Sequence, residues 1–130
     1  MAYTFNKIDY VMITVSNMAR SVAFYKDKLG IPMKFGTPEW TEFQTGTTTL
    51  ALHGGGKPQE GQKAQGGEHY AGTCSIGFNV DNLELAYEQL QAKGVEFVMP
   101  PTERAGEGIK LAIAIDPDGL AISFGQAAKK

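Results

Sequence analysis

The feature that most constrains this chain is an internal repeat. Residues 11–17 read V-M-I-T-V-S-N, and residues 76–82 read I-G-F-N-V-D-N, so an alternating run that ends in a polar pair recurs 65 residues later. Such alternation is typical of a β-strand with one buried face. The chain is therefore expected to fold as two related halves.

A helix is predicted after each copy of this strand. Asn17 and Asn82 stand where a side-chain oxygen can accept from the first turn, so both are predicted N-caps. Gly30 and Gly94 are suited to the left-handed residue that ends a helix. Between these landmarks the offset falls from 65 to 64 residues. The apolar positions with helical spacing are Met18, Val22, Tyr25 and Leu29 in the first half and Leu83, Tyr87 and Leu90 in the second.

Three further strand-like runs follow each helix. They cover residues 31–35, 39–45 and 47–53 in the first half, and 95–99, 109–115 and 120–125 in the second. The expected fold class is α+β, with two tandem βαβββ modules whose curved mixed sheets enclose a pocket. We expect residues 1–130 to form one domain, with module 1 at about 6–53, a linker at 54–72 and module 2 at about 73–125.

The linker holds seven glycines and mostly polar residues, which cannot bury enough apolar surface to fold alone. It is predicted to be a connector between the halves or a lid over a ligand.

Side-chain alternation predicts which face of each sheet meets the helices. In the first strand of each half, the alternating apolar residues should pack on the helices. In residues 109–115 the same rule places Leu111 and Ile113 on the helix-facing side of the sheet. It places Ala112 and Ala114 on the opposite side. The opposite face is rich in small side chains, which leave room for a small molecule. The predicted ligand-binding residues on it are Tyr10, Met12, Trp40, Glu42, Ala51, His53, Ser75, Asn79 and Ser123.

Composition excludes several other functions. The net charge is −2 with no basic run, so nucleic-acid binding has no electrostatic basis. No stretch approaches the roughly 18 apolar residues of a membrane span. The single cysteine, Cys74, favours a reducing compartment, and we expect a cytoplasmic protein. By strand parity Cys74 should lie buried on the helix side.

Short motifs spread over residues 6–125 resemble the vicinal-oxygen-chelate superfamily, which includes glyoxalases, extradiol dioxygenases and bleomycin-resistance proteins. They are V-S-N-M-A-R-S-V-A-F-Y-K-D-K-L-G at 15–30, N-V-D-N at 79–82, K-G-V at 93–95 and D-P-D-G at 116–119. The resemblance implies the fold and a homodimer. D-P-D-G itself is predicted to be a tight turn.

Metal-dependent members of that superfamily carry His or Glu at four positions, which correspond here to Tyr10, Ala51, Ser75 and Ser123. None of these four is a good ligand for a divalent cation, so neither a metal nor another cofactor is expected. A second set, Glu42, His53 and His69, could hold a metal only if the linker docked.

The leading hypothesis is metal-independent binding or sequestration of a polar or cationic small molecule, similar to the bleomycin-resistance group. The alternative is a superfamily enzyme, a lyase, isomerase or dioxygenase, with non-standard or no metal ligands, in which Glu42 is a candidate base. An accessory interaction module is the third possibility.

Overall fold

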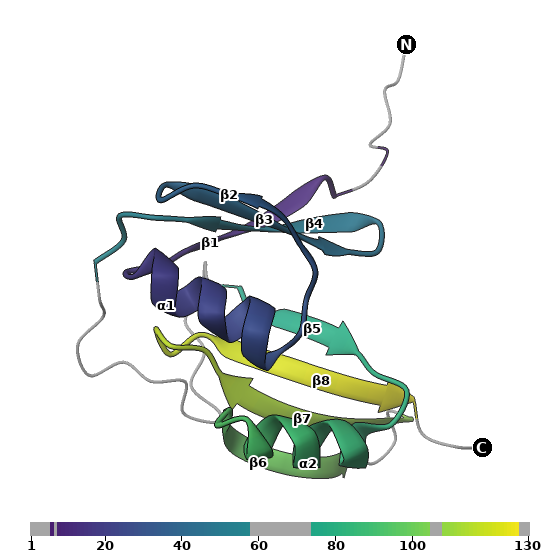
Figure 1. The fold of residues 1–130 in the computed structure, drawn as a ribbon. Helices are drawn as coiled ribbons and strands as arrows, with labels where there is room; N and C mark the ends of the chain where they lie inside the picture. Colours follow the sequence, from purple (N-terminus) through teal and green to yellow (C-terminus); the bar gives the residue numbers. More distant parts are fainter. Residues whose placement is uncertain (1–5, 7, 58–73, 105–107, 128–130) are drawn as a thin grey trace. The chain divides into compact units, whose positions relative to one another are not determined.

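The structure is a computed structural model that describes residues 6, 8–57, 74–104 and 108–127. The chain divides into two compact units, Met1–Pro58 and Gln59–Lys130, each with a four-stranded mixed sheet. Both units have the element order βαβββ, so the predicted fold class is confirmed (Figure 1). None of the helices in the described part of the chain is long and apolar enough to cross a membrane.

In the N-terminal unit the sheet has the order β1-β4-β3-β2. Strands β1 and β4 are parallel, and the other neighbours are antiparallel. The elements are β1 (Tyr10–Thr14), α1 (Met18–Val22), the π-helical segment η1 (Ala23–Lys28), β2 (Met33–Gly36), β3 (Trp40–Thr45) and β4 (Thr48–His53).

The C-terminal unit repeats this arrangement with the order β5-β8-β7-β6, and again only the first pair is parallel. Helix α2 covers one face of this sheet (Figure 1). The elements are β5 (Ile76–Asn79), α2 (Leu83–Ala92), β6 (Glu96–Arg104), β7 (Ile109–Ile115) and β8 (Ala121–Ala127).

The predicted helix ends are confirmed in both units. The Asn17 side-chain oxygen accepts from the backbone N–H of Arg20 at 3.0 Å, and Asn82 accepts from that of Leu85 at 3.1 Å. Gly30 and Gly94 have φ angles of 78° and 89°, the left-handed conformation that favours glycine.

A π-helical segment accounts for the change of offset between the two helices. In η1 the backbone N–H of Leu29 donates to the oxygen of Phe24, five residues earlier, at 2.9 Å. An α-helical bond spans four residues, so a π-turn holds one residue more. The first helix therefore fits one extra residue between its cap and its terminal glycine.

The core of the N-terminal unit lies on the predicted face of its sheet. Leu50, Leu52 and Phe43 are buried, and the ring of Tyr25 packs against that of Phe43 at 6.1 Å between centroids. The hydroxyl of Thr41, on the same face, contacts the sulfur of Met18 at 3.3 Å. Leu50 and Leu52 are therefore buried as predicted, whereas Val11 of β1, assigned to the same set, is 37% exposed.

The prediction for β7 is wrong. Leu111 pairs with Gly125 and Ile113 with Ser123, so both point away from α2. Ala112 and Ala114 are fully buried opposite Phe124 and Ile122. The large side chains on the helix side come from β8 and β5, and small residues on β7 leave space for them and for α2.

Two of the three glycines at 54–56, at the start of the predicted linker, hydrogen-bond to the N-terminal unit. The amide of Gly54 donates to Glu39 and that of Gly56 donates to Val15. A Cβ on Gly56 would lie 2.6 Å from the Thr14 side chain, so no larger residue fits. Most of the predicted linker or lid, with His69, lies outside the described residues.

The D-P-D-G segment forms the predicted turn between β7 and β8. Asp116 is buried, and its Oδ1 accepts from the backbone N–H groups of Asp118 at 2.9 Å and Leu120 at 2.8 Å. Gly119 has a φ of 90°. The turn fixes the register with which β8 returns along β7.

Replacing this carboxylate should therefore destabilise the fold. Asp116→Ala leaves two backbone N–H groups without their acceptor, and we expect the free energy of unfolding to fall by about 2–3 kcal/mol. Urea denaturation followed by circular dichroism measures this. Asp116→Asn keeps one acceptor oxygen and should lose less. Equal losses in the two variants would contradict the role given to Oδ1.

Replacing Ser21 should stabilise the fold instead. Its side chain is fully buried in α1, and its hydroxyl has no hydrogen-bond partner in the part of the chain that the structure describes. Ser21→Ala removes an unsatisfied polar group and improves helix propensity, so we expect a gain of about 1 kcal/mol in the same denaturation experiment. A loss of that size would mean that the hydroxyl is bonded.

Candidate functional site

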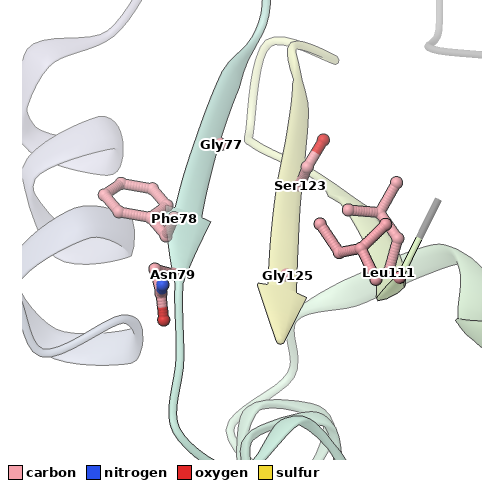
Figure 2. Close-up of a pocket in the computed structure, with 8 residues that line it drawn as sticks. Gly77, Phe78, Asn79, Leu111, Ser123 and Gly125 are labelled. Atoms are coloured by element: carbon pink, nitrogen blue, oxygen red, sulfur yellow. The ribbon is translucent and has the colours of Figure 1, made fainter. Parts of the chain in front are cut away.

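A pocket of about 440 Å³ lies on the C-terminal sheet. Its floor is made by Gly77 on β5 and by Ser123 and Gly125 on β8 (Figure 2). The complete lining is Gly77, Phe78, Asn79, Gly108, Ile109, Leu111, Ser123 and Gly125.

Strand register explains why these residues meet. Gly77 pairs with Ser123, Asn79 pairs with Gly125, and Gly125 pairs in turn with Leu111. Paired residues point to the same face of a sheet, so the strand residues of the lining share one face, with the exception of Phe78. In Figure 2 the Ser123 and Leu111 side chains extend on one side of β8, and the ring of Phe78 points away from them.

The pocket combines an apolar wall with two polar groups. Ile109 and Leu111 form the wall, and a Cβ on Gly125 would come within 3.2 Å of the Ile109 side chain. A Cβ on Gly77 would meet only Ser123, at 3.9 Å. The polar groups are the Asn79 amide and the Ser123 hydroxyl, and neither side chain has a hydrogen-bond partner among the described residues.

The N-terminal sheet carries larger side chains at the equivalent positions. Met12 pairs with Ala51 as Gly77 pairs with Ser123, and His53 pairs with Trp40 as Gly125 pairs with Leu111. Met12 and His53 thus stand where the second module has its two glycines. Their side chains occupy the volume that the glycines leave open.

The N-terminal face brings most of the predicted first-module site residues together. The Trp40 ring meets Tyr10 edge-on at 5.9 Å and His53 edge-on at 6.1 Å between centroids. Tyr10 and Met12 are about half exposed, whereas Ala51, the register partner of Met12, is fully buried. The face is therefore an aromatic and apolar surface.

Glu42 is already engaged on this face. Its Oε2 accepts from the Trp40 indole N–H at 2.8 Å, and its Oε1 lies 3.9 Å from the Lys34 ammonium. Lys34 also donates to the Thr49 hydroxyl at 2.5 Å. Lys34 thus offsets the negative charge that the sequence suggested for binding a cation.

His53 is held by its own backbone. Its Nδ1 lies 2.7 Å from the Gly54 carbonyl oxygen, which can only accept. Nδ1 is therefore the donor, and in the neutral ring Nε2 is an acceptor. The imidazole is exposed and can offer this acceptor to a ligand.

The four positions that correspond to metal ligands do not fit a divalent cation. Ala51 presents a buried methyl group, Ser123 a hydroxyl beside an apolar wall, and Tyr10 a phenol ring packed on Trp40. Ser75 is exposed and precedes β5. Carboxylate and imidazole donors are lacking at all four. The described residues also contain no group of three His, Cys, Asp or Glu able to hold a metal.

Cys74 differs from expectation, and two lining residues of the pocket were missed. Cys74 is exposed, not buried, because it precedes β5 and strand parity does not apply to it. Gly125 and Leu111 were not among the predicted site residues. Glycine inside a strand often marks close approach of a ligand, so Gly77 and Gly125 carried a signal that could have located the pocket.

Comparison with known proteins agrees with this architecture. The Bacillus subtilis (strain 168) protein YraH, itself uncharacterized, is 28% identical over 117 residues, which cover 86% of this chain and 91% of YraH. Two solved structures share the fold. A glyoxalase family protein from Enterococcus faecalis has a TM-score of 0.75 at 22% identity, covering 93% of this chain and 98% of that one. A glyoxalase/bleomycin resistance protein/dioxygenase from Nocardioides has a TM-score of 0.73 at 20% identity, and the match covers 98% of this chain and 87% of that one.

A family model matches residues 7–124, nearly the whole chain. With the repeated βαβββ order and the turn at 116–119, this match identifies the chain as a member of the Glyoxalase/Bleomycin resistance protein/Dioxygenase superfamily.

Proposed function

We propose that this protein binds a small organic molecule in the pocket of its C-terminal module, without a metal ion at the four superfamily positions. The observation that carries the proposal is the pair of strand-interior glycines, Gly77 and Gly125, on either side of Ser123. Glycine weakens a strand, so two of them on one face need a reason. Room for a ligand against the backbone is such a reason.

The size and lining of the pocket support the same proposal. Its volume of about 440 Å³ lies within the range of small-molecule sites, about 300–1,000 Å³. Such sites are mostly apolar with a few polar groups that orient the ligand. Ile109 and Leu111 would supply the apolar contact, while Asn79 and Ser123 would orient the ligand by hydrogen bonds.

The N-terminal face is proposed as a separate contact surface. Tyr10, Met12 and Trp40 would supply apolar contact there, and Glu42 and His53 would offer polar atoms. Ser75 and Ala51 were also predicted to bind the ligand. We propose that they lie beside these surfaces without contacting it. The homodimer and the cytoplasmic location implied earlier are likewise proposals, and sedimentation of the purified protein tests the first.

A Gly77→Val variant tests the proposed pocket. Valine favours strands, and the space around Gly77 accepts a Cβ, so we expect the free energy of unfolding to stay equal or to rise by about 0.5–1 kcal/mol. The added side chain projects from the pocket floor into the space next to Ser123, so binding should weaken by about tenfold or more. Titration calorimetry against a panel of antibiotics and metabolites identifies the ligand to be used.

The matched control is Ala121→Val, which enlarges a small residue of β8 that does not line the pocket. It should leave the affinity unchanged. Unaltered affinity in a folded Gly77→Val protein would refute this location for the site, and purified protein that binds no compound would count against the function itself.

A further inference from the structure

We infer that the C-terminal pocket selects uncharged ligands, with an apolar body and one hydrogen-bonding group. This inference deepens the proposed function and rests on it. It starts from the chemistry of the lining, because none of the eight lining residues has an ionisable side chain.

The charged side chains nearest in register do not line the pocket. Lys110 pairs with Glu84 at 3.4 Å, and its position between Ile109 and Leu111 on β7 directs it to the α2 face of the sheet. Arg104 pairs with Ile109 in the neighbouring strand, so it shares the pocket face; it is exposed and lies at the rim, outside the lining. Within the described residues, a charged ligand group that is buried against the lining would therefore meet no opposite charge, and Arg104 is the cation at the rim.

The cost of desolvation explains why this lining should favour uncharged ligands. Moving a charged group from water into an apolar site is unfavourable unless the site pairs it. A neutral carbonyl, amide or hydroxyl group loses less hydration free energy on entering the pocket, and Asn79 and Ser123 can replace its hydrogen bonds to water. The Asn79 amide offers both donors and an acceptor, and the Ser123 hydroxyl offers one donor and an acceptor. Both are available for such pairing, since neither bonds to another described residue.

Two fluorescent probes with the same aromatic frame test the inference. N-phenyl-1-naphthylamine is uncharged, and 8-anilinonaphthalene-1-sulfonate adds one negative charge. We expect the full chain to bind the uncharged probe about tenfold or more tightly than the sulfonate. Gly77→Val should weaken the binding of both probes by about tenfold or more, because its side chain takes up space on the pocket floor.

Asn79→Lys supplies the converse test. A cation at the pocket should raise the affinity for the sulfonate and reverse the preference. Asn79→Gln is the matched control, since it lengthens the side chain without a charge, and it should keep the preference for the neutral probe.

The outcomes separate the inference from the proposed function. Equal affinity for both probes, lost for both in Gly77→Val, would overturn charge selection and keep the pocket as the site. Tighter sulfonate binding that Arg104→Gln abolishes would also overturn it, because the rim cation would then select anions. Binding that ignores Gly77→Val, or no binding of either probe, would contradict the pocket as the site, and the inference with it.

Discussion

The register that β8 makes with both of its neighbours determines the rest of the candidate site. The parallel pairing to β5 sets Gly77 beside Ser123, and the antiparallel pairing to β7 sets Leu111 beside Gly125. A shift by one residue would turn the glycines toward α2 and present Phe124 to the pocket face. The Asp116 turn, which joins β7 to β8, holds this register through two hydrogen bonds to a buried carboxylate.

The two modules share one backbone plan and differ in what they place on it. The first carries Met12 and His53 where the second carries glycine, so one sheet has a filled aromatic face and the other an open pocket. The two modules also differ in charge: the Lys34–Glu42 pair lies on the N-terminal face, whereas the lining of the C-terminal pocket is neutral. Membership of the superfamily fixes the plan, whereas these side chains decide the chemistry.

Local signals predicted the local structure well. The 65-residue repeat predicted both modules, and the asparagine caps and the D-P-D-G turn formed as expected because neighbouring residues determine them. The predicted orientation of β7 was wrong, because side-chain size alone does not decide which face of a strand is buried. Ala112 faces α2 since Phe124 fills that layer, and this depends on pairing between strands distant in sequence. The π-turn of η1 was visible only as a one-residue change in offset.

The central claim is that the glycine-floored face of the second module is where a neutral ligand binds. An NMR titration of isotope-labelled protein with N-phenyl-1-naphthylamine tests it most directly. We expect the amide signals of Gly77, Gly108 and Gly125 to shift, while those of Gly30 and Gly46 in the first module do not. Shifts confined to the N-terminal strands, with the three pocket glycines unmoved, would contradict it.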